Sequence, residues 1–62
     1  MTQEDKFEAA GLAHTLSESL KVSAYLEGHS DHDAKYHLDR AHENFAKLAD
    51  MMGYTVTKKG GA

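Results

Sequence analysis

Residues 34–52, AKYHLDRAHENFAKLADMM, carry the clearest structural signal in the chain. Their apolar residues are separated by four, three, four, three and four positions. These residues are Ala34, Leu38, Ala41, Phe45, Leu48 and Met52. Alternating steps of three and four keep side chains on one stripe of an α-helix, and helical bundles use such a stripe as a contact seam. We therefore predict an amphipathic helix whose seam runs through these positions.

Capping signals mark the helix boundaries. Ser30 followed three residues later by Asp33 resembles a capping box, and Thr2 with Asp5 repeats the pattern near the start of the chain. Glycine readily adopts the left-handed conformation that ends a helix, and Gly28 and Gly53 stand where it is needed. The sequence thus predicts helices over about residues 3–27 and 31–52.

The first helix repeats the spacing less regularly, and Leu12 and Leu26 widen one flank. Its seam is predicted to comprise Ala9, Ala13, Leu16, Leu20 and Ser23. The connection between the helices is short enough to make them antiparallel neighbours. Facing residues should then have numbers that add up to about 58, so that Leu20 meets Leu38 and Ala13 meets Phe45. Leu16 should likewise meet Ala41 and Ala9 should meet Leu48, so that a large side chain faces a small one in three of the four layers, as in a well-packed core.

The predicted fold is all-α: residues 1–53 form an antiparallel two-helix hairpin, and residues 54–62 form a short extended or disordered tail. A hairpin this small buries little surface, and we expect Leu12, Leu26, Phe7 and Met51 to remain uncovered in a single copy. A second hairpin would cover them, so we expect a homodimeric four-helix bundle. The residues expected in the core or the oligomer interface are Leu12, Leu16, Leu20, Leu26, Leu38, Ala41, Phe45, Leu48 and Met52.

The charge balance argues against tight, sequence-blind binding to nucleic acid. Seven basic and ten acidic residues give a net charge of −3, whereas such binding needs a basic surface. Arg40, Asn44 and Lys47 are the only candidate nucleic-acid face, and an ordinary solvated face explains them better. No apolar stretch approaches the roughly 18 residues of a membrane span. With no cysteine and no signal-peptide pattern, we expect a cytoplasmic location without membrane contact.

Catalytic and metal-binding patterns are missing from the sequence. The five histidines lack the Glu-x-x-His pairs of di-iron bundles, and His37 and His42 do not share a helix face. The serines lack a nucleophile-elbow motif, and no glycine-rich phosphate loop is present. We therefore expect no enzyme activity, no cofactor and no bound metal, with the histidines in contact with solvent.

The layout resembles the ROP family of small RNA-binding hairpins, in chain length, in the polar run at the start and in the two-helix plan. This resemblance implies pairing of two hairpins into a four-helix bundle. In that family the first helix contacts RNA, and the matching face here carries His14, Glu18 and Tyr25, of which Glu18 disfavours RNA. Separately, the ending LADMMGYTVTK, residues 48–58, is similar to the ends of many small phage-encoded proteins.

The remaining clue to function is the number of apolar residues outside the predicted seam. Val22, Tyr25 and Tyr36 lie off it, and so many in 62 residues suggest that another surface covers some of them. We expect a homo-oligomeric interaction module that binds a protein partner, of the accessory kind that phages or mobile elements encode. An RNA-binding homodimer is the alternative, and a metal-binding helical bundle is the third.

Overall fold

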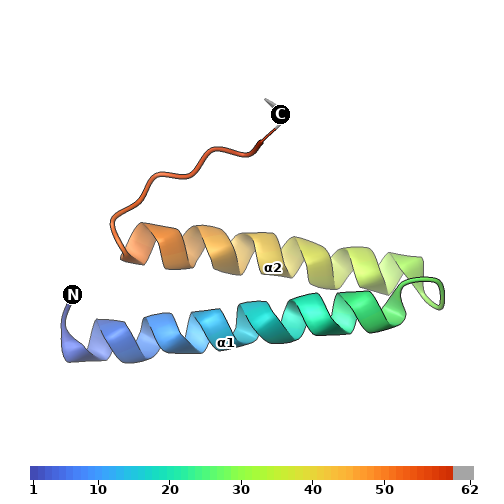
Figure 1. Ribbon diagram of the computed structural model, residues 1–62, viewed down its shortest axis with the longest axis horizontal. Helices are drawn as coiled ribbons and strands as arrows, with labels where there is room; N and C mark the ends of the chain where they lie inside the picture. Colours follow the sequence, from blue (N-terminus) through green and yellow to red (C-terminus); the bar gives the residue numbers. More distant parts are fainter. Residues whose placement is uncertain (60–62) are drawn as a thin grey trace.

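The computed structural model describes residues 1–59 and consists of two antiparallel helices joined by a short turn (Figure 1). Helix α1 spans Gln3–Leu26 and helix α2 spans Asp31–Met51. Each begins where the sequence predicted and ends one residue earlier. Residues 54–59 contain neither helix nor strand. The part of the tail prediction that concerns residues 60–62 lies outside the described residues.

The start of α1 is held by the predicted capping box. The backbone N–H of Asp5 donates to Thr2 Oγ1 at 3.0 Å, and the backbone N–H of Thr2 donates to Asp5 Oδ2 at 3.1 Å. These two bonds satisfy donors that a helix N-terminus otherwise leaves without partners. The capping prediction for α1 is therefore confirmed.

The turn between the helices depends on Gly28 and on a carboxylate. Gly28 has a φ of +83°, which is the left-handed region that glycine adopts without strain. Its N–H donates to Asp31 Oδ1 at 2.9 Å, and the N–H of Ser30 donates to the Leu26 carbonyl at 2.8 Å. The sequence predicts that the Ser30 hydroxyl caps the backbone of α2, and this prediction is wrong. The hydroxyl instead donates to Asp33 Oδ2 at 2.8 Å.

Small side chains form the contact between α1 and α2. The buried residues on the facing sides are Ala9, Ser19, Ala34, Ala41 and Asn44. Ala41 is the most enclosed of them, with 2% of its surface exposed. Among the described residues, no large side chain is fully buried. The two helices therefore meet along small residues, and their contact buries little apolar surface.

The predicted seam of α2 is only half right for the single chain. Ala34 and Ala41 are buried and Leu48 is half-buried, but Leu38, Phe45 and Met52 are 41%, 48% and 54% exposed. The side of α2 that turns toward α1 instead includes His37 and Asn44. Alanine and leucine every seven residues are compatible with a contact on either flank of the stripe. Because His37 and Asn44 are polar, an apolar pattern could not identify their flank as the contact.

The contact surface of α1 is also rotated away from the predicted seam. Leu20 is 47% exposed and Ala13 is exposed, whereas Leu12 and Leu26 are half-buried and Ser19 is buried. The prediction that Leu12, Leu26 and Met51 remain uncovered is therefore wrong: all three are half-buried in the hairpin. Phe7 is uncovered as expected, with 71% of its surface exposed.

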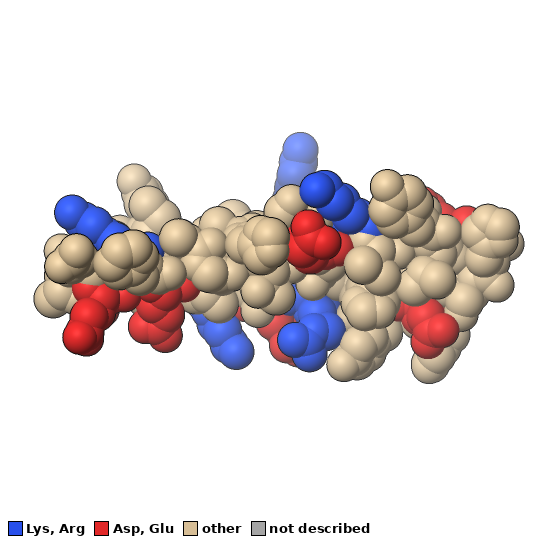
Figure 2. All heavy atoms as spheres, turned by 90° about the horizontal axis from the view of Figure 1, so that it is seen from below, with Lys and Arg blue, Asp and Glu red and all other residues tan. Residues whose placement is uncertain are grey.

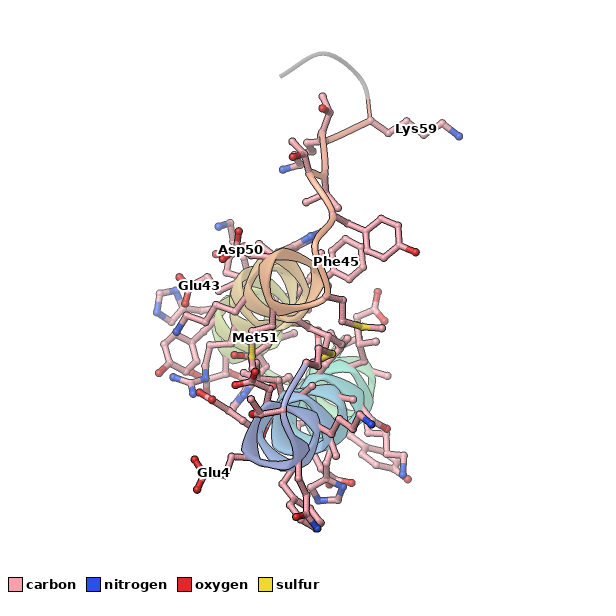
Figure 3. The ribbon with its side chains drawn as sticks, turned by 90° about the vertical axis from the view of Figure 1, so that its left-hand side faces the viewer. Glu4, Glu43, Phe45, Asp50, Met51 and Lys59 are labelled. Atoms are coloured by element: carbon pink, nitrogen blue, oxygen red, sulfur yellow. The ribbon has the colours of Figure 1, made fainter. Side chains whose placement is uncertain are left out.

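The molecule is a layer one helix thick. Its dimensions are 41 × 28 × 11 Å, and the view along the helices shows α1 and α2 stacked with the C-terminal segment rising beyond α2 (Figure 3). A single layer has two broad faces, and neither is covered by another element of the described chain. The character of these faces determines what the molecule can bind.

Candidate interaction surface

One broad face of the layer gathers the large apolar side chains. It comprises Leu20 of α1 and Leu38, Phe45 and Met52 at the α2 side, and we call these four residues the open face. All four are between 41% and 54% exposed. In the end-on view Phe45 points to one side of α2 and Glu43 to the other (Figure 3). The open face is thus apolar and uncovered in the single chain.

A groove follows the open face. It has a volume of about 620 Å³ and is lined by Leu16, Leu20, Leu38 and Phe45 of the helices and by Val56 beyond them. A second depression of about 440 Å³ adjoins it toward the turn and shares Leu20 and Leu38 with the first. Together they form a continuous trough along the hairpin.

The C-terminal segment forms the outer wall of this groove. Gly53, with a φ of +88°, redirects the chain, and the Tyr54 N–H donates to the Ala49 carbonyl at 2.9 Å. The segment then doubles back along α2, on the side away from α1 (Figure 1). Val56, Lys58 and Lys59 line the groove from there. The groove therefore has an apolar floor and a partly basic rim.

The residues predicted as a nucleic-acid face do not lie together. Asn44 is only 8% exposed and lies in the contact between the helices, so it cannot accompany Arg40 and Lys47 on an exposed surface. Its Nδ2 has no hydrogen-bond partner among the described residues. The Arg40 guanidinium lies 5.9 Å from the centre of the Tyr36 ring, a cation–π arrangement on the surface. Grouping Asn44 with the two basic residues was wrong.

Charges on the rest of the surface are mixed. Seen from the α1 side, basic and acidic side chains are interspersed along the molecule (Figure 2). Two ion pairs occur among the described residues: Lys21 with Glu18 at 3.7 Å and Lys35 with Asp39 at 2.9 Å. The hydrogen bond from Lys35 lowers the pKa of Asp39 below its ordinary value of 3.8. Exposed pairs of this kind contribute little to stability.

A metal-binding bundle requires several ligand side chains close together. Within residues 1–59, no group of three or more His, Asp or Glu side chains is placed so that it could hold a metal ion. The same residues contain no helix that combines the length and the apolar character needed to cross a membrane.

Comparisons with protein-family models, with curated proteins and with solved structures find no significant match to this chain. The resemblance to the ROP family therefore concerns the helical layout alone.

Proposed function

We propose that the protein is a non-enzymatic helical interaction module that pairs with a second copy through its open face. The product is a homodimeric four-helix bundle, which in turn binds a protein partner. One observation carries the proposal: small residues occupy the contact within the hairpin, while the large apolar residues occupy the uncovered face. A hairpin built in this way keeps its main hydrophobic contacts for another surface.

The energetics favour covering this face. Apolar surface contributes roughly 25 cal/mol for each Å² removed from water, so full burial of a leucine or phenylalanine contributes about 1.5–3 kcal/mol. Leu20, Leu38 and Phe45 each leave more than two fifths of their surface in water in the single chain. A domain of 62 residues has only a small margin of stability, so contributions of this size matter.

The heptad pattern supports a bundle as the form of assembly. Leu38, Phe45 and Met52 recur every seven residues beside the stripe of Ala34, Ala41 and Leu48. A helix in a four-helix bundle touches two neighbours and therefore needs two adjacent stripes. In this hairpin the second stripe of α2 has no neighbour, and a second copy supplies one.

The dimer can be tested by sedimentation equilibrium at micromolar concentration. The wild-type chain of 6.8 kDa should sediment with twice that mass. Phe45→Glu places a charge on the open face and should yield the single-chain mass. Tyr36→Glu is the matched control, because Tyr36 is a similarly exposed aromatic residue outside the open face, and it should remain dimeric. A wild-type monomer with a cooperative, concentration-independent thermal transition would disprove the dimer.

Aromatic residues outside the open face are available for a partner. Phe7 and Tyr25 of α1 are 71% and 79% exposed, and neither lines the groove. Exposed aromatic side chains are typical anchors at protein interfaces. A protein captured from a bacterial lysate by the wild-type chain should be lost with Phe7→Ser or Tyr25→Ser and retained with Thr15→Ser. Equal capture by all four chains would mean that these aromatic residues are not the contact.

A further inference from the structure

The C-terminal segment is anchored at one end only. Gly53 N–H donates to the Asp50 carbonyl at 3.0 Å and Tyr54 N–H donates to the Ala49 carbonyl at 2.9 Å, which fixes the start of the segment on the end of α2. Beyond Tyr54, no backbone hydrogen bond to residues 55–59 is formed within the described chain. Backbone groups without internal partners are satisfied by water or by another chain. The segment is therefore held near the hairpin without being paired to it.

The segment lines the groove together with the two helices. Val56 lies in the groove lining with Leu20 and Leu38 and is 43% exposed, so much of its apolar surface is in contact with water. The space between has a volume of about 620 Å³. Apolar walls around so much water are unfavourable, and protein interiors fill such spaces with side chains. The groove thus has the shape of a site whose occupant enters between the C-terminal segment and the helices.

The dimensions and the charges identify a second copy as the occupant. The broad face measures 41 × 28 Å, so a partner of the same shape could cover on the order of 800 Å² on each copy, the area of a standard interface. Lys58 and Lys59 line the groove on the C-terminal segment, whereas the trough at the turn is lined by Glu27 and Asp31 together with Lys35, whose ammonium is paired with Asp39. A copy related by two-fold symmetry and running in the opposite direction brings lysines of each chain toward carboxylates of the other.

We infer that residues 54–59 form an arm that holds the second copy on the open face, with Val56 as its apolar contact. The inference rests on the proposed dimer and adds to it a defined contact in trans. It also explains why a valine follows Gly53 and Tyr54 in an otherwise polar tail: Val56 is the only aliphatic residue of residues 53–59. The arm acts in addition to the four residues of the open face.

Two substitutions in the full-length chain separate the arm from the rest of the interface. Val56→Asp puts a carboxylate into the groove and should weaken dimerisation roughly tenfold or more, because a buried charge without a partner is unfavourable. Thr55→Asp makes the same change of charge at the adjacent residue, which does not line the groove, and should change the dimer dissociation constant less than about threefold. Sedimentation over a concentration series measures both.

A spin label shows directly whether the arm contacts its own chain or the other one. The chain has no cysteine, so Val56→Cys provides a single thiol for a nitroxide. Mixed with ¹⁵N-labelled wild-type chain, it should broaden the amide signals of the labelled copy around Leu20 and Leu38. No broadening in the ¹⁵N-labelled copy, or equal affinities for Val56→Asp and Thr55→Asp, would overturn the arm and leave the dimer intact. A wild-type chain that is monomeric throughout, including one that binds lipid vesicles instead, would overturn both proposals.

Discussion

The Ser23 hydroxyl donates a hydrogen bond of 2.7 Å to the backbone carbonyl of Ala34. Among residues 1–59 it is the only side-chain hydrogen bond that joins α1 to α2. The numbers of the two residues add up to 57, one less than the register predicted from the turn. Because one partner is backbone, the bond fixes the distance between the helix axes as well as their relative position along the hairpin.

Replacing Ser23 by alanine should lower the free energy of unfolding by about 1 kcal/mol, the usual contribution of a hydrogen bond. Alanine also favours helix by a few tenths of a kcal/mol over serine, which opposes the loss. Ser17→Ala, at an exposed position of the same helix, measures that opposing effect alone. Urea unfolding of the two variants gives the difference. Equal free energies of unfolding for Ser23→Ala and Ser17→Ala would mean that the hydrogen bond to Ala34 contributes nothing to stability.

Asn44→Leu should raise the free energy of unfolding by about 1 kcal/mol, because it removes a buried amide nitrogen that lacks a partner. The side chain is 8% exposed, and its Nδ2 has no hydrogen-bond partner within the described residues. Asn44→Asp should have the opposite effect, since it buries a charge at the same place. Thermal unfolding of the three chains at equal concentration tests the order. A destabilised Asn44→Leu would show that the amide is satisfied in the assembled protein.

Ala41→Leu should destabilise the hairpin by about 1–3 kcal/mol, the range for overpacking a core. Ala41 is 2% exposed between the helices, so added carbon atoms must push them apart. Ala10→Leu, at an exposed position of α1, is the control and should be close to neutral. Circular dichroism during urea unfolding reports both. Tolerance of leucine at position 41 would contradict a contact built from small residues.

Lowering the pH should remove the contribution of the Lys35–Asp39 pair to the stability of the folded state. Since the folded-state pKa of Asp39 lies below its ordinary value of 3.8, the pair stabilises the folded state above pH 3.8, and the effect is lost as the pH falls through the lowered pKa. Lys35→Met should return the pKa of Asp39 toward 3.8, because the hydrogen bond from Lys35 is the main cause of the shift. An NMR titration of the Asp39 side-chain carboxyl carbon measures this, and an identical titration curve in the variant would rule out the pair.

Local chemistry in the sequence was sufficient to predict the hairpin. Thr2 with Asp5, the left-handed Gly28 and the apolar repeat of residues 34–52 each act within a few positions of the chain. They give two helices, their direction and their ends to within a residue. The second glycine signal, Gly53, also adopts the predicted left-handed conformation.

The tertiary structure decided which flank of each helix meets the other. An apolar repeat with a second apolar residue beside it is compatible with two rotations of the helix, and the sequence pattern favoured the one that turns Leu38 and Phe45 inward. In the folded chain, close approach of the helices selects the rotation with small and polar residues between them, at Ser19, Ala41 and Asn44. The capping pattern and the hydrophobic spacing act along one helix, whereas the fit between two helix surfaces depends on side-chain volumes from both. For this reason the sequence alone determined that the chain forms a hairpin, and only the packing of one helix on the other decided that its large apolar side chains form an open face.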